Sequence, residues 1–248
     1  MKLSVLLPVK DQSAKLLGNL RDHILPYFDK QGIVYDVLIC YDGSNESERK
    51  LMEDGVKDLP AHVKLLPYED KKGKGHNVKK AMLASESDYV LFMDADLATR
   101  LDIFDKIKED LGNADCYIAS RDVEGSEYGI KQPLLRQLNH RGCRKVVSWM
   151  FKMKTIRDSQ CGYKCIRTTL AKKYVPLSII DGFAFDVEML YFLTLNGYTV
   201  KELPAFWSDD PDSSVGGVFS TAKRFYGDLR RIKKNKKNYI LGGKDNAH

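Results

Sequence analysis

The sequence has no long apolar run and no recognisable leader. Its longest uncharged stretch, residues 189–200, has twelve residues, whereas a helix that crosses a membrane needs about 20. The chain opens with MKLSVLLPVKD, which has the pattern of a first strand and not of a secretory signal. These absences predict a cytoplasmic protein that lacks a transmembrane segment and a signal peptide and is at most peripheral at a membrane.

Paired cysteines are also lacking. The chain has five cysteines, an odd number that does not make a disulfide framework and that favours a reducing compartment. Cys161 and Cys165 are separated by three residues, but no second pair and no nearby histidine completes a zinc site. We interpret both as buried or half-buried thiols.

Two common nucleotide-binding motifs are missing. No G-x-G-x-x-G follows the first strand, which argues against a dinucleotide oxidoreductase. The segment KKGKG at residues 71–75 does not have the spacing of a P-loop. It does precede a predicted helix, where Lys74 and the backbone N–H groups could approach a diphosphate.

Positive charge is concentrated near the end of the chain. The net charge is +6, and residues 223–237 hold eight Lys or Arg against Asp228 alone, so the rest of the chain is nearly neutral. Apolar residues spaced by four and three positions predict a helix with one apolar seam: Val218, Ala222, Phe225, Leu229 and Ile232. The seam predicts that this helix packs on the body of the protein. Its charge favours an anionic partner, either a membrane surface or DNA. A charged helix that is only solvated would have the same sequence pattern. We therefore divide the chain into a domain at residues 1–217 and a basic amphipathic helix and tail at 218–248.

Short apolar runs alternate with amphipathic stretches in the first half of the chain. Strands are predicted at residues 3–9, 36–41, 63–67, 89–93 and 115–120, and helices at 14–28, 76–85 and 101–111. In the second half, helices are predicted at 132–151 and 185–195 and extended segments at 160–167 and 199–207. The pattern indicates the α/β class with a mostly parallel central sheet, in which ligands bind beyond the carboxyl ends of the strands.

Three aspartates follow predicted strands. Asp94 and Asp96 come directly after the apolar run at 89–93, and a pair of carboxylates there can hold Mg²⁺ or Mn²⁺ while phosphate oxygens complete the shell. Asp42 ends the second strand, where a carboxylate can bind ribose or base. The alternative for all three is an ordinary role in turns and helix caps.

The second half supplies further charged candidates. Asp186 and Glu188 lie near a predicted helix start, where they would either line a site or only interact favourably with the helix dipole. Arg121 and Arg136 follow a strand and would form either an anion pocket or a solvated helix face.

The order of the motifs PVKD, YDGS, GKG-HNVKKAM, MDADLAT, ASR, IRDSQCGYK, FAFDVEMLY and PAFW resembles glycosyltransferase family 2, and within it the dolichyl-phosphate glucosyl- and mannosyltransferases. The match runs from about residue 2 to residue 207. The resemblance implies a Rossmann-like GT-A fold for nucleotide-diphosphosugar transferases. It also implies a metal-dependent, inverting transfer of a hexose or pentose from a UDP- or GDP-sugar to a polyprenyl or dolichyl phosphate.

The resemblance also implies a role for individual residues. The expected nucleotide-sugar site comprises Pro8, Val9, Asp42, Lys74, Asp94 and Ala95. Asp94 and Asp96 are expected to hold the metal, and Arg121 and Arg136 the acceptor phosphate. The expected sugar and acceptor pocket comprises Asp158, Gln160, Gly162, Asp186 and Glu188.

Several alternatives remain open from the sequence. A phosphate acceptor needs no general base, whereas a hydroxyl acceptor would make Asp186 the base. A soluble enzyme of the phage type could instead glycosylate a hydroxymethylated base in DNA. A haloacid-dehalogenase-like phosphatase would need Thr or Val at position 98, where this chain has Ala98, and a non-catalytic sugar-nucleotide-binding module is also consistent with the motifs.

Overall fold

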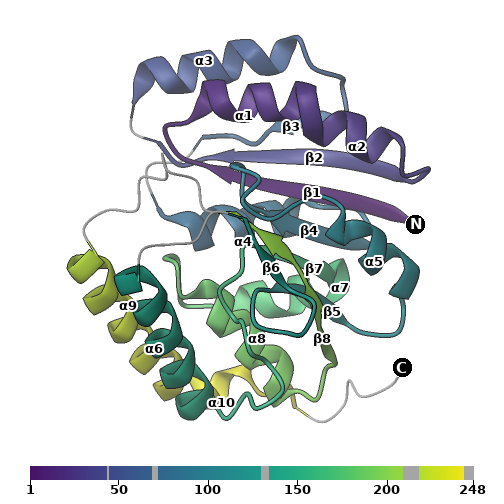
Figure 1. The fold of residues 1–248 in the computed structure, drawn as a ribbon. Helices are drawn as coiled ribbons and strands as arrows, with labels where there is room; N and C mark the ends of the chain where they lie inside the picture. The colour runs from purple at the N-terminus through teal and green to yellow at the C-terminus, as the bar shows by residue number, and fades with distance from the viewer. Residues whose placement is uncertain (44, 69–71, 130–133, 209–217, 243–248) are drawn as a thin grey trace.

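The computed structural model describes residues 1–43, 45–68, 72–129, 134–208 and 218–242 (Figure 1). Within these ranges, the side chains of residues 134–141 and 218–222 are not described. The elements discussed below belong to this described part of the chain.

A seven-stranded sheet crosses the molecule in the order β3-β2-β1-β4-β7-β5-β8 (Figure 1). Its strands are β1 (Lys2–Val9), β2 (Val34–Tyr41), β3 (Val63–Leu65), β4 (Tyr89–Met93), β5 (Cys116–Ser120), β7 (Tyr163–Arg167) and β8 (Val200–Pro204). All neighbours pair in parallel except β7, which runs antiparallel to both β4 and β5. The predicted mostly parallel sheet is confirmed.

Side chains of the central strands are buried on both faces of the sheet. In β1, Leu3, Val5 and Leu7 join one core cluster, whereas Leu6 joins the other, because successive strand residues point to opposite faces. Helix residues such as Leu16 and Phe104 cover the first face, and Val78 and Met82 cover the second. The sheet is therefore the middle layer of three, as expected for strands that are apolar along their whole length.

Helices connect most of the strands. The first half contains α1 (Ser13–Asn19), the π-helical turn η1 (Leu20–Ile24), α2 (Leu25–Asp29), α3 (Glu46–Lys57), α4 (Lys74–Ala84) and α5 (Ile103–Asp110). The second half contains α6 (Leu134–Phe151), α7 (Thr168–Tyr174), the 3-10 turn η2 (Val175–Leu177), α8 (Phe185–Leu195), α9 (Val218–Lys234) and α10 (Lys236–Tyr239). The sequence analysis missed α3 and α7. The signal for α3 was present, because the Asn45 side chain caps it by accepting from the N–H groups of Ser47 (3.0 Å) and Glu48 (3.4 Å).

The predicted closing strand is divided between two sheets. Residues of β8 pair with β5, but after Ala205 the chain forms β9 (Phe206–Trp207), which pairs with β6 (Glu127–Tyr128) in a two-stranded sheet. This second sheet lies beside Arg121, whose guanidinium is 5.5 Å from the centre of the Trp207 ring. The division therefore places the aromatic ring of Trp207 near the end of β5.

The C-terminal helix is part of the packed body. Phe225, Leu229 and Ile232 on α9 are buried in the same core cluster as α8, together with Tyr239 on α10. Helices α9 and α6 lie side by side (Figure 1), and the Cys143 sulfur on α6 is 3.6 Å from the Tyr226 hydroxyl on α9. The predicted packing of the apolar seam is confirmed for its described residues. Within the described ranges, no helix has both the length and the apolar character needed to cross a bilayer.

Candidate functional site

Asp42 holds the loop that leads into α4. It follows β2, its N–H donates to the Val9 carbonyl (2.8 Å), and its side chain is mostly buried. Its Oδ1 atom accepts from the backbone N–H groups of Lys72 (3.0 Å) and Gly73 (3.2 Å). Pro8 and Val9 end β1 directly beside the end of β2, in register with Cys40 and Tyr41. The end of this strand pair therefore positions the entry to α4.

Lys74, the first residue of α4, reaches the end of β4. Its Nζ atom is 2.5 Å from Oδ1 of Asp94, while the Asp94 N–H donates to the Gly162 carbonyl (2.9 Å). Burial by itself lowers the pKa of the Lys74 ammonium, but the Asp94 and Asp186 carboxylates outweigh burial and raise it overall. Lys74 is therefore a charged cation at the carboxyl end of β4.

Gly162 makes room for the Asp94 carboxylate. A Cβ atom at position 162 would lie 1.9 Å from Oδ2 of Asp94, far inside van der Waals contact. Only glycine leaves this space, so the loop before β7 and the end of β4 are fitted to each other. Gly162, which the resemblance assigns to the sugar and acceptor pocket, is therefore in direct contact with Asp94.

A second ion pair lies behind the first. The Lys164 ammonium is fully buried on β7, 2.7 Å from Oδ1 of Asp186 at the start of α8 and 2.5 Å from the Cys161 carbonyl. Burial raises the pKa of Asp186 above its ordinary value, against the opposing charges of Lys164 and Lys74. The four groups, namely Lys74, Asp94, Lys164 and Asp186, form a compact cluster of alternating charge.

Asp96 lies on a tight turn that a neighbouring helix supports. Its Oδ1 atom accepts from the Ala98 N–H (3.0 Å), and Leu97 has a φ of +58°, a conformation that non-glycine residues rarely adopt. Asn19, where α1 meets the π-helical turn, donates to the Ala95 carbonyl at 2.8 Å. The backbone between the two aspartates is thus held from outside the loop.

Asp94 and Asp96 fit a metal ion that takes only some of its ligands from the protein and the others from a bound substrate. Among the described residues, no group of three or more His, Cys, Asp or Glu side chains converges on one point. Both carboxylates are half-buried and follow the same strand, so two hard oxygen donors are offered. Mg²⁺ and Mn²⁺ are bound in this way when phosphate oxygens supply the remaining ligands.

Asp158 and Arg121 form a separate buried pair. Oδ2 of Asp158 accepts from Arg121 Nε (2.6 Å) and Oδ1 accepts from a terminal guanidinium nitrogen (2.8 Å), with Asp158 fully buried. Burial opposes its charge, but Arg121 holds the pKa of Asp158 well below its usual range. Arg144 pairs with Asp122 nearby. With two nitrogens occupied, Arg121 is first of all the partner of Asp158.

The structure brings together most of the residues expected at the site. Lys74 pairs directly with Asp94, the Asp186 carboxylate is near enough to help raise the pKa of Lys74, and Asp42 adjoins them through residues 72 and 73. Arg136 lies within α6, but its side chain is outside the described part of the structure. Glu188 instead faces the interior, where residues 174, 178–180 and 239 donate to it.

Two residues of the site were missed by sequence reasoning. Lys164 lies in the motif IRDSQCGYK but received no role, although a lysine inside an otherwise apolar strand signals a buried counterion. Asn19 had no sequence signal, because its contact with Ala95 depends on how α1 packs beside the end of β4.

Comparisons with known proteins were consistent with one another. A model of the family described as Glycosyl transferase family 2 matches residues 4–174. A dolichyl-phosphate beta-glucosyltransferase from Dictyostelium discoideum is 30% identical over 253 residues, covering 97% of this chain and 75% of the relative. The Homo sapiens protein of the same name is 25% identical and covers 86% of this chain and 69% of the relative.

Solved structures with a similar fold are more distant in sequence. Glucosyl-3-phosphoglycerate synthase from Mycobacterium tuberculosis, in complex with Mn²⁺, UDP and glucosyl-3-phosphoglycerate, has a TM-score of 0.67 at 14% identity. That comparison covers 98% of this chain and 81% of the other. Mannosyl-3-phosphoglycerate synthase from Rubrobacter xylanophilus has a TM-score of 0.65 at 15% identity, covering 100% and 78% of the two chains. At these identities the likeness concerns the fold.

Proposed function

Because this chain belongs to glycosyltransferase family 2 and has the GT-A fold, we propose that it transfers glucose from UDP-glucose to dolichyl phosphate or a closely related polyprenyl phosphate. The observation that carries the proposal is the charge cluster of Lys74, Asp94, Lys164 and Asp186 beyond the end of β4. Relatives named for dolichyl phosphate and glucose support the choice of acceptor and sugar.

In this proposal Lys74 binds the donor diphosphate. Its ammonium is charged and lies next to Asp94, so a short movement would transfer it from the carboxylate to phosphate oxygens. Asp94 and Asp96 would hold Mg²⁺ or Mn²⁺, which when bound neutralises charge on the leaving diphosphate. Lys164 keeps Asp186 in place behind them. The neighbouring loop at 157–162, whose Gly162 carbonyl accepts from the Asp94 N–H, would border the sugar.

The chemistry of a phosphate acceptor suits the groups present. A lipid phosphate is already anionic near neutral pH and attacks the anomeric carbon without a base. Direct attack on the face opposite the α-linked diphosphate inverts the centre and yields a β-linked product. Asp186, whose pKa burial raises, would then shape the pocket and modulate its charge, without having to take a proton.

The outer surface of α9 supports an acceptor at a membrane. All eight Lys and Arg residues at 223–237 are exposed, while the described residues of the apolar seam, Phe225, Leu229 and Ile232, are buried. The Trp149 side chain on the adjacent α6 is 81% exposed, and Tyr226 on α9 is 37% exposed. Exposed aromatic residues beside basic ones are typical of surfaces that bind the interface of anionic membranes.

This surface can be tested without disturbing the core. Replacing Arg230 and Lys234 with Gln removes two exposed charges, and at about 1 kcal/mol per charge we expect roughly 30-fold weaker binding to vesicles rich in anionic lipid. The matched control replaces Lys50 and Lys57 on α3, which are equally exposed. Equal vesicle binding by both double variants in a flotation assay would contradict the assignment of the surface.

The two competing enzyme readings are not favoured. The family match and the lipid-phosphate names of the relatives support neither a DNA acceptor nor a haloacid-dehalogenase-like phosphatase. Hydroxymethylated DNA therefore serves as the negative control acceptor in the transfer assay described next.

A mass-spectrometric assay tests the function itself. UDP-glucose, GDP-mannose and dTDP-glucose are each incubated with Mn²⁺ and either dolichyl phosphate or hydroxymethylated DNA. We expect glucosylated dolichyl phosphate from UDP-glucose, loss of product with EDTA, and at least 100-fold less product for Asp96→Ala, since charge stabilisation at such sites is typically worth 100- to 1,000-fold. Asp102→Ala, an exposed aspartate of the same loop, is the control. Product on DNA alone, or wild-type rates in Asp96→Ala with EDTA, would refute the proposal.

A further inference from the structure

Residues 178–182, before α8, form a wall against which α4 begins. The Asp181 carbonyl accepts from the His76 N–H (3.2 Å), and the Asp181 carboxylate accepts from Lys79 (2.8 Å). Gly73 has a φ of +112°, and a Cβ atom there would lie 2.6 Å from the Asp181 carbonyl oxygen. The first turn of α4, which carries Lys74, therefore lies between Asp42 on one side and this wall on the other.

The wall is held from behind by Glu188. This carboxylate is fully buried on α8 and accepts from the Ile179 N–H (2.8 Å), the Ile180 N–H (3.3 Å) and the Ser178 hydroxyl. Tyr174 also donates to it, at 2.9 Å. A buried carboxylate with this many donors fixes the backbone of the wall, because each unmade bond would leave a polar group buried and unpaired.

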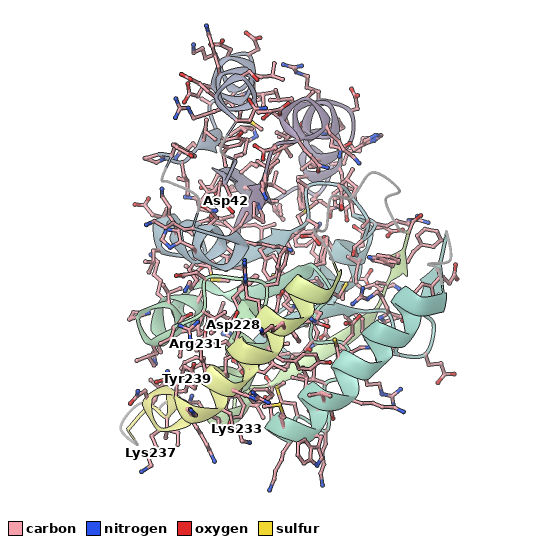
Figure 2. The ribbon with its side chains drawn as sticks, turned by 90° about the vertical axis from the view of Figure 1, so that its left-hand side faces the viewer. Asp42, Asp228, Arg231, Lys233, Lys237 and Tyr239 are labelled. Carbon is pink, nitrogen blue, oxygen red and sulfur yellow. The ribbon has the colours of Figure 1, made fainter. Side chains whose placement is uncertain are left out.

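The C-terminal helices reach the same wall. The Tyr239 hydroxyl on α10 donates to Glu188 at 2.6 Å, and the Arg231 guanidinium on α9 donates to the Ile179 carbonyl at 3.1 Å. Asp228 pairs with Arg231 at 3.0 Å on the same side of α9 (Figure 2). Lys233 lies on the other side of α9 and donates to the Met150 carbonyl of α6 (Figure 2).

From these contacts we infer that α9 and α10 position Lys74 for the donor diphosphate, acting through Glu188 and residues 178–182. Glu188, Tyr239 and Arg231 are positioning residues, since none of them lies beside Asp94. The inference rests on the proposed role of Lys74 in binding the diphosphate. It gives the C-terminal helices a part in donor binding that is separate from their basic outer surface.

The test compares two basic residues of the same helix. Arg231→Met removes a contact with the wall, whereas Lys233→Met removes contacts with α6 and with the Tyr191 ring of α8 but none with residues 178–182, and it serves as the matched control. Tyr239→Phe removes one hydroxyl and keeps the buried ring. We expect Tyr239→Phe and Arg231→Met to weaken UDP binding about 5-fold and to raise the donor KM, whereas Lys233→Met changes neither. In a Lys74→Ala background, both effects should disappear.

Each outcome decides the inference. Equal losses in all three variants, or no loss in Tyr239→Phe and Arg231→Met, would overturn it, because general loosening or no coupling would then explain the data. If the wild-type protein binds no nucleoside diphosphate, the proposed function fails, and hydrogen exchange of residues 72–77 decides the inference alone. Faster exchange in Tyr239→Phe and Arg231→Met than in Lys233→Met would uphold the positioning of α4, and equal exchange would overturn it.

Discussion

Replacing Gly162 with Ala should greatly reduce transfer, although Gly162 has no functional side chain of its own. In Gly162→Ala the new Cβ would lie 1.9 Å from Oδ2 of Asp94, so the carboxylate must retreat by about 1.5 Å to reach ordinary contact. The Asp94 carboxylate is also held by Lys74 at 2.5 Å, so this movement breaks the ion pair or tilts it. Misplacement by about 1 Å can cost 100-fold in rate, and we expect at least that loss of transfer.

The assay separates this local effect from unfolding. Overpacking costs about 1–3 kcal/mol, which should leave the fold intact in circular dichroism and urea titration, while Mn²⁺-dependent UDP binding falls in parallel with transfer. Gly142→Ala on α6 is the control, since a Cβ there meets nothing within 4 Å. It should stabilise the protein by about 0.5–1 kcal/mol without loss of activity. Transfer by Gly162→Ala within a factor of three of the wild type would refute the fitted contact with Asp94.

Three further substitutions test the buried charges. Lys164→Met should leave Asp186 without its nearest cation and cost about 3–5 kcal/mol in urea unfolding, whereas Lys201→Met, at a half-exposed pair with Asp110, should cost at most about 1 kcal/mol. Asp158→Asn should cost about 3–5 kcal/mol at pH 7. Because the folded pKa of Asp158 is lowered, its stabilising contribution is complete above its unfolded pKa of about 4 and is lost as the pH falls from there through the folded pKa. The difference from the wild type should therefore shrink in acid. Asp186→Asn should retain transfer to phosphate acceptors far better than transfer to hydroxyl acceptors, and equal loss with both would mean that it does not act as a base.

Most of the fold followed from local patterns in the sequence. The strand at 89–93 and the helix at 185–195 were predicted with the bounds that the structure has, because each is an apolar run ended by charged or turn residues. Helix α3 was missed because its residues are mainly charged and only Met52 is buried, so its clearest cue was the capping residue Asn45 and not an apolar run. The antiparallel direction of β7 could not be predicted, since strand direction depends on where the connecting segments cross.

The site was predictable where a residue's chemistry follows from its strand end. Asp42 and Asp94 were recognised from strands alone, and Lys74 from the glycines around it. Contacts between distant segments were not predictable: nothing in the sequence places Gly162 against Asp94. Glu188 was expected to line the pocket, but it accepts hydrogen bonds in the protein interior. Its position near a helix start did not reveal these donors, because tertiary packing brings them together.

The reversed direction of β7 has a consequence for how the molecule is assembled. Met93 pairs with Tyr163, about 70 residues later, so this edge of β4 is covered only after most of the chain is available. Until then β4 is an apolar edge strand, and its unpaired backbone groups can form hydrogen bonds with a strand of another chain. We expect residues 1–93 to be the most aggregation-prone part of a nascent chain, and the order of synthesis to make the candidate site at the end of β4 one of the last regions to mature.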